Sequence, residues 1–102
     1  MKKVILMLLL VATSTCANAG VTMFGTYDCA QWFIKKELAK SWLLGYLSGL
    51  ASMDDGKSGD VLDRLNSAEQ AYLWMDNYCK ANPLNTIGKG GNALYLELQR
   101  RK

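Results

Sequence analysis

The sequence predicts an all-α protein, a small domain of about four helices stapled by one disulfide. It contains one proline and no convincing run in which apolar and polar residues alternate as they do in a strand. Apolar residues recur instead at the spacing of an α-helix, in regions separated by short polar loops. Two cysteines, Cys29 and Cys79, lie in the part of the chain that should remain after an N-terminal leader is removed during export. Together these observations favour a helical fold with one covalent cross-link.

The first 19 residues have the pattern of a secretory signal peptide. Two lysines follow the first methionine, residues 4–12 are apolar, and residues 17–19 place small side chains where a signal peptidase reads them. We therefore predict cleavage after Ala19, a mature helical domain over residues 20–102, and a periplasmic location.

Two other interpretations of this leader compete with cleavage. Its apolar segment has about nine residues, whereas a bilayer span needs ~20, so we expect no stable membrane insertion after cleavage. A lipoprotein attached through Cys16 would also follow an apolar segment. It ranks second, because Thr15 is larger than the Gly, Ala or Ser usually found before such a cysteine.

Cleavage changes the composition in two ways. The formal net charge of +3 falls to +1 because two lysines are lost, and so small a basic surplus argues against a nucleic-acid partner. The three cysteines fall to two, and an even count in an exported chain predicts a Cys29–Cys79 disulfide. Closing this loop of roughly 50 residues would contribute about 4 kcal/mol in the chain-entropy model.

The first helical region is expected to begin at Thr26, a suitable N-cap, with Asp28 in the first turn. Cys29, Trp32 and Phe33 recur at helical spacing, so one face carries both the disulfide and two large aromatic side chains. A charged patch follows, which we interpret as solvated surface that includes a break between two helices. Its members are Lys35, Lys36, Glu37 and Lys40.

The second region, residues 41–53, is predicted to be a packed helix. Gly45 and Gly49 form a G-x-x-x-G pattern inside it, and each glycine costs about 1 kcal/mol relative to alanine. We expect another helix of the same chain to pack closely over these glycines as compensation. The predicted buried stripe consists of Trp42, Tyr46, Gly49, Leu50 and Met53.

The third helix is expected to start at Asn66 or Ser67, with Ser67 and Gln70 forming a capping box. It must stop near Asn82, because the following Pro83 disfavours helical backbone. Asp76 and Asn77 lie on the other face of this helix, and the packing pattern does not explain their presence. The predicted buried face consists of Ala68, Ala71, Tyr72, Met75, Tyr78 and Cys79.

A final helix is expected to begin after Asn85 or Thr86. Ile87, Leu94 and Leu98 form its apolar stripe, with Tyr95 beside it. Its first two turns contain Gly88, Gly90 and Gly91, so we predict that the secure part starts near Asn92.

The segment over residues 53–61 is an acidic turn punctuated by glycines. It lacks the first glycine of a phosphate-binding loop and the ligand spacing of a calcium loop. The simplest interpretation is a flexible surface loop. A more specific hypothesis is that the loop contacts a partner protein. The candidate partner-binding residues are Asp54, Asp55, Lys57 and Asp60.

Catalysis is not expected from this set of residues. The chain has no histidine, which removes Ser–His and Cys–His pairs and imidazole metal sites. The two mature cysteines are expected in the disulfide, and the Asp54–Asp55 pair lacks the apolar pocket that would raise one pKa for acid catalysis. We therefore predict no enzyme activity, no catalytic residues, no cofactor and no metal.

Three blocks in this order resemble the Rap/Tai family of small periplasmic proteins, whose named members are immunity proteins of type VI secretion systems. The blocks are Cys29 with Trp32, "WLLGYLSGL" at residues 42–50 and "LWMDNYCKANPL" at residues 73–84, followed by the C-terminal residues Gly91, Ala93, Leu94, Glu97 and Leu98. The resemblance implies an all-helical domain with an internal disulfide that binds a toxic effector, often a peptidoglycan amidase, and occludes its active site.

The predicted function is accordingly that of a periplasmic immunity-type binding protein with a protein effector or toxin as its partner. The sequence is also compatible with a homodimer. Two alternatives of other classes also remain, a periplasmic acid-stress chaperone and a subunit of an envelope complex. The chaperone would suppress aggregation of its clients in acid, where Asp and Glu become protonated.

Overall fold

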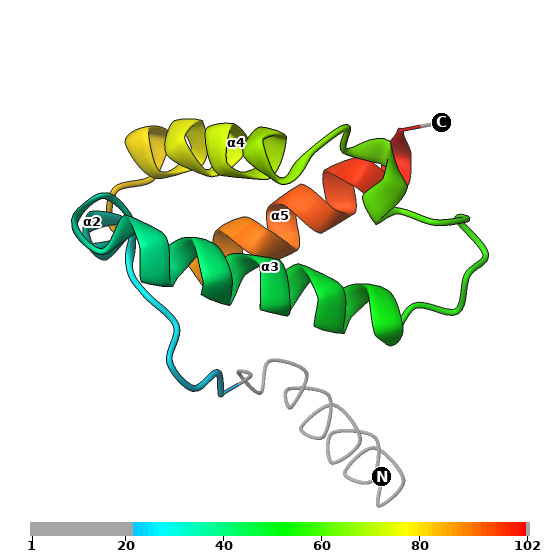
Figure 1. The fold of residues 1–102 in the computed structure, drawn as a ribbon, viewed down its shortest axis with the longest axis horizontal. Coiled ribbons are helices and arrows are strands. Elements are labelled where there is room, and N and C mark those ends of the chain that lie inside the picture. Colours follow the sequence, from blue (N-terminus) through cyan, green and yellow to red (C-terminus); the bar gives the residue numbers. More distant parts are fainter. Residues whose placement is uncertain (1–21, 102) are drawn as a thin grey trace, which may run out of the picture.

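The computed structural model describes residues 22–101, which are mostly helical. The helices are α2 (Cys29–Ile34), α3 (Lys36–Ser52), α4 (Ala68–Ala81) and α5 (Ile87–Arg100), with a short 3₁₀ helix η2 (Leu62–Arg64) before α4. The longer helices α3 and α4 pack on opposite sides of α5, and α2 packs on α3 and α4 at one end (Figure 1). The all-α prediction is confirmed.

Two sequence-based predictions concern the N-terminal leader. The signal peptide expected over residues 1–19 and the alternative lipid attachment at Cys16 lie outside the described residues. Within residues 22–101, no helix combines the length and the apolar character needed to cross a membrane.

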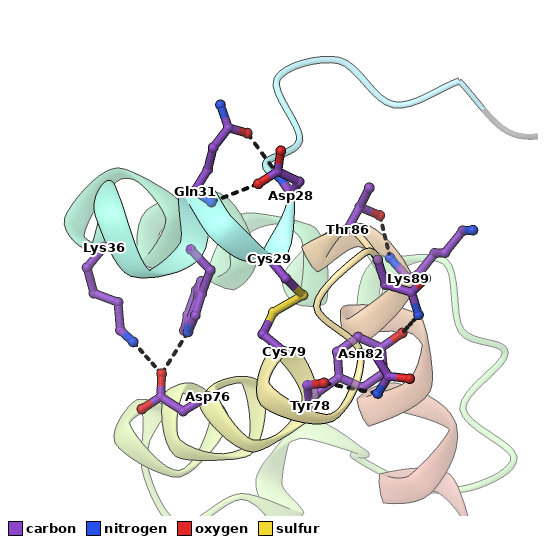
Figure 2. Close-up of a disulfide and its surroundings, with 12 residues drawn as sticks. Asp28, Cys29, Gln31, Lys36, Asp76, Tyr78, Cys79, Asn82, Thr86 and Lys89 are labelled. Atoms are coloured by element: carbon purple, nitrogen blue, oxygen red, sulfur yellow. Dashed lines mark hydrogen bonds and ion pairs between the residues drawn. A yellow bond between two sulfur atoms is a disulfide. The ribbon is translucent and has the colours of Figure 1, made fainter.

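The predicted disulfide joins Cys29, the first residue of α2, to Cys79 near the end of α4, with a Cα–Cα distance of 5.1 Å. Two backbone hydrogen bonds lie beside it. The Cys29 N–H donates to the Asn85 carbonyl and the Ile87 N–H donates to the Tyr27 carbonyl, both at 2.9 Å. We call these five residues the stapled junction, because they hold the start of α2, the end of α4 and the start of α5 together (Figure 2).

Helix α2 begins two residues later than predicted, because Asp28 and not Thr26 is its N-cap. The Asp28 carboxylate accepts from the Gln31 N–H at 2.7 Å, and the Gln31 side chain accepts from the Asp28 N–H at 3.0 Å, which completes a capping box (Figure 2). Asp28 pairs with Thr86 in a β-bridge, and this keeps the chain extended up to the cap. The expected break between the first two helices is confirmed at Lys35.

Helix α3 buries a different stripe from the one predicted. Ala39, Leu43 and Leu47 are buried at intervals of one turn, whereas Met53 is 86 % exposed. The predicted residues Trp42, Tyr46 and Leu50 flank this stripe and are half-buried. The reason is the position of α5, whose Gly91 lies over Leu43 and Tyr46 and so fixes which side of α3 faces inward.

The close packing predicted over Gly45 and Gly49 is not found, and α5 is helical from Ile87 rather than from near Asn92. Gly45 and Gly49 are exposed, and within residues 22–101 nothing lies within 4 Å of a Cβ added at either position. The α5 glycines are buried, and a Cβ at Gly90 would lie 2.6 Å from Met75 Sδ on α4. A Cβ at Gly91 would lie 2.9 Å from the Tyr46 ring on α3. Because Gly90 and Gly91 have no side chains, α5 can pack closely between α3 and α4.

The ends of α4 and α5 follow the sequence signals with one exception. Helix α4 begins after Ser67 and ends before Asn82, and α5 begins after Thr86, whose hydroxyl accepts from the Lys89 N–H at 3.3 Å. The capping box expected at Ser67 does not form in the described part of the chain. The Gln70 side chain instead accepts from the Asn66 N–H at 3.3 Å.

The contrast between the glycines gives a matched pair of substitutions. Gly45→Ala should raise the free energy of unfolding by about 1 kcal/mol, because it improves helix propensity at an open position. Gly90→Ala makes the same chemical change but overfills the contact with Met75 and Tyr78, at a cost of about 1–3 kcal/mol. Urea unfolding should therefore show a gain for the first variant and a net loss for the second. Equal gains would contradict the proposed packing of α5.

Candidate functional site

The loop over residues 53–61 leads from the end of α3 to η2 and carries the four predicted partner-binding residues. Asp54 ties this loop to α5. Its carboxylate accepts from the Tyr95 hydroxyl at 2.6 Å and, at 3.4 Å, from Gln99 Nε2. The same side chain also accepts from the Gly56 N–H at 2.9 Å. Asp54 thus has a structural role in addition to any contact it makes with a partner.

The other three predicted residues are more exposed. Asp55 accepts from the Lys57 N–H at 2.9 Å, and the Lys57 ammonium lies 3.9 Å from the other Asp55 oxygen. The side chains of Asp55 and Lys57 are 64 % and 87 % exposed, and Asp60 is exposed as well. The loop turns sharply at Gly56 and Gly59, which adopt φ values of 78° and 82° that favour glycine.

Asp54 and Asp55 border an open hollow of about 410 Å³ between the end of α3 and α5. Lys57 and Asp60 do not line it. The exposed Met53 stands beside the two carboxylates, which places an apolar side chain next to negative charge. A hollow of this kind is suited to a side chain with an apolar stem and a positive end, such as lysine or arginine. Its lining consists of Leu50, Met53, Asp54, Asp55, Tyr95 and Gln99.

The hydrogen bond between Tyr95 and Asp54 sets the charge of the hollow. Donation by Tyr95 is the main cause that lowers the pKa of Asp54 below its ordinary value. Burial, together with the bond to Asp54, raises the pKa of Tyr95 to about 12. At neutral pH the aspartate is therefore negative, while the tyrosine is neutral and keeps its proton in the bond.

Arg64 fixes the far end of the same loop, a role that the sequence did not reveal. Its Nη1 donates to the carbonyls of Leu98 and Gln99 at 2.7 and 3.0 Å, and its Nη2 donates to the Ser58 carbonyl. A cation at the C-terminal end of a helix satisfies carbonyls that have no partner within the helix and complements the helix dipole. The loop is thus anchored to α5 through both Asp54 and Arg64.

Asp76, which packing patterns left unexplained, links three helices. Its carboxylate on α4 accepts from Trp32 Nε1 at 2.7 Å and from the Lys36 ammonium (Figure 2). Partial burial acts to raise the pKa of Asp76, but the bonds from Lys36 and Trp32 outweigh it and leave the pKa below its ordinary value. Interpreting Lys36 as plain solvated surface was therefore wrong, since its ammonium also lies 4.6 Å from the centre of the Trp32 ring.

Two further surface features carry no charge. A hollow of about 360 Å³ lies against α3 and is lined by Met23, Phe24, Ser41, Trp42, Gly45 and Tyr46. Asn77 is exposed on the outer face of α4, where it borders a smaller hollow of about 260 Å³ with Trp74. Neither feature combines charge with an apolar surface as the hollow beside Asp54 does.

Comparison with known proteins identifies no relative of this chain. No family model matches it, and neither the curated proteins nor the solved structures contain a significant match. Across residues 22–101, no group of three or more His, Cys, Asp or Glu side chains is arranged to hold a metal ion.

Removing the Tyr95 hydroxyl should change how Asp54 titrates. The pKa of Asp54 is lower in the folded protein than in the unfolded chain. Its negative charge therefore stabilises the fold at pH values above the unfolded-state pKa of about 3.9. This stabilisation is lost as the pH falls through the folded-state pKa. Tyr95→Phe should raise the pKa of Asp54 toward the ordinary value, measured by NMR titration of the carboxyl carbon. Tyr72→Phe is the control, and an Asp54 titration that is equal in both variants would contradict this assignment.

Proposed function

We propose that this chain is a periplasmic immunity-type binding protein that neutralises a toxic effector by occluding its active site. The observation that carries the proposal is the hollow bordered by Asp54 and Asp55, where negative charge adjoins the exposed side chain of Met53. Exposed apolar surface next to charge is a common feature of protein contact surfaces.

The way the loop is held supports a role in binding. Asp54 anchors its start to Tyr95 on α5, and Arg64 anchors its end to the last turn of the same helix. A loop fixed on a rigid scaffold loses little conformational entropy when a partner binds, so more of the contact energy appears as affinity. The stapled junction adds a covalent constraint to that scaffold.

The charge of the hollow indicates what the effector would present. Asp55 has an exposed carboxylate whose only described cation is the Lys57 ammonium at 3.9 Å. A basic side chain of the effector could displace this weak surface pair, with its apolar stem against Met53. The class of effector, a peptidoglycan amidase, rests on the resemblance to immunity proteins. Binding is proposed in place of catalysis because the sequence has no histidine and residues 22–101 show no other constellation suited to covalent or acid–base chemistry.

A protection assay tests this function. An immunity protein is expected to be encoded beside its toxin, so the product of the neighbouring reading frame should be exported to the periplasm of a test strain with and without this chain. We expect lysis when the neighbour is expressed alone and growth when the full chain is expressed with it. Asp55→Lys should reduce the protection at least tenfold, measured as surviving cells, because it places a cation where the effector's cation binds.

Glu37→Lys is the matched control, since it makes the same charge reversal at an 87 % exposed carboxylate near the opposite end of α3. It should leave protection unchanged, and circular dichroism should show that both variants fold. A wild-type chain that gives no protection would contradict the immunity function. Equal protection by the two variants would leave the function standing but would reject the hollow as the contact surface.

A further inference from the structure

The corner where α2 meets α3 exposes a cluster of apolar side chains. Helix α2 packs on α3 and α4 with its inner side, and the chain turns at Lys35 into α3. On the outside of this turn Phe33 is 45 % exposed, Ile34 78 % and Leu38 62 %, and we call these three residues the apolar corner. Single exposed apolar residues are common on protein surfaces. Three of them within six positions instead indicate a contact surface.

Lysine side chains surround the apolar corner. Lys35 is exposed at the turn itself, and its ammonium forms no ion pair with any part of residues 22–101. The ion pair of Lys40 with Glu37 is a weak surface contact, because the two atoms are 3.7 Å apart and the carboxylate is 87 % exposed. Lys36, by contrast, is already neutralised by Asp76. The corner therefore combines apolar side chains with positive charge that has little compensation.

The formal charge also differs between the two ends of the molecule. Residues 28–40 and 76–89 lie toward the end that contains the apolar corner and the stapled junction, and they hold five lysines and three carboxylates (Figure 1). The other described residues hold four cations and six carboxylates. Among these are the carboxylates of the hollow beside Asp54, at the opposite end of α3. An anionic partner is therefore attracted to the end with the apolar corner.

We propose that the apolar corner docks on an anionic lipid surface. Phe33, Ile34 and Leu38 enter the headgroup region, while the lysine ammonium groups contact lipid phosphates and their stems lie against the apolar side chains. A lipid surface accepts projecting side chains without a matching hollow, and none of the three lines a hollow described above. This contact places the molecule on the surface of a membrane and requires no spanning segment.

Docking at this corner also orients the molecule. Helix α3 runs from the apolar corner to the hollow beside Asp54, and its 17 residues place the two about 25 Å apart. The acidic end is repelled by an anionic surface, so the hollow points away from the lipid. This inference goes beyond the proposed function and does not depend on it, although the orientation leaves the hollow accessible to an effector.

Flotation with lipid vesicles tests the docking. The oxidised full chain should float with vesicles made of equal parts of phosphatidylglycerol and phosphatidylcholine. Its affinity for vesicles of phosphatidylcholine alone should be at least about fivefold lower, because a single lysine near an anionic surface already accounts for that factor. Added salt should weaken the first interaction. Equal affinity for the two kinds of vesicle would overturn the proposal, and so would no binding to either.

A matched pair of leucine substitutions locates the contact. Leu38 on α3 and Leu73 on α4 are both 62 % exposed. Leu38→Ser should lower the affinity for anionic vesicles about tenfold, because a large apolar side chain no longer leaves water. Leu73→Ser should leave the affinity unchanged. The N-terminal leader is the same in both variants, so any binding of its own cancels in this comparison.

A second pair tests the charge. Lys35→Gln should lower the affinity for anionic vesicles about fivefold, whereas Lys57→Gln, at the other end of the molecule, should not change it. Circular dichroism should show that all four variants fold. Equal affinities within either pair would overturn the proposal.

The rival occupant of the corner is a second copy of the chain, because the lysine-rich end of one molecule attracts the acidic end of another. Analytical ultracentrifugation without vesicles separates the two cases. A monomer at the concentrations used for flotation supports docking on lipid. Self-association that Leu38→Ser abolishes would assign the corner to contacts between copies and overturn the proposal.

Discussion

The covalent bond between Cys29 and Cys79 is the constraint on which the rest of this structure depends. It joins two positions 50 residues apart in the sequence, and it does so where three helix ends already meet. The capping box of Asp28, the β-bridge to Thr86 and the backbone bonds of Cys29 and Ile87 all lie within a few residues of it. A domain this small has limited apolar surface to bury, so a cross-link at the meeting point of its helices stabilises the whole arrangement.

From that junction α5 passes between α3 and α4, and its glycines make the passage possible. Because Gly90 and Gly91 have no side chains, they leave space for Met75 and Tyr46. The close contact on both sides of the helix offsets the backbone entropy that the glycines lose on folding. Beyond the glycines, Leu94 and Leu98 remain buried in the core, and polar bonds are added around them. Asp54, Glu97 and Arg64 link α5 to the loop, to α4 and to η2. The candidate binding surface lies at this end of the molecule, away from the stapled junction.

Local signals in the sequence predicted most of the fold but only part of the site. Pro83 after Asn82 and the N-cap at Thr86 placed helix ends correctly, and the even cysteine count identified the disulfide. The buried stripe of α3 and the role of the glycines were missed, because they depend on which helix lies opposite, and periodicity within one helix does not contain that information. Asp54, Asp76 and Arg64 bond to residues more than thirty positions away, so no local pattern could assign their partners.

If the cross-linked junction holds this fold together, thermal unfolding of the oxidised chain should depend on the disulfide. The chain-entropy model assigns the bridge about 4 kcal/mol, so Cys29→Ser with Cys79→Ser should melt at a clearly lower temperature than the oxidised wild type. A thiol reductant should lower the wild-type melting temperature to the same value and leave that of the variant unchanged. Equal melting temperatures for the oxidised wild type and the variant would contradict the account.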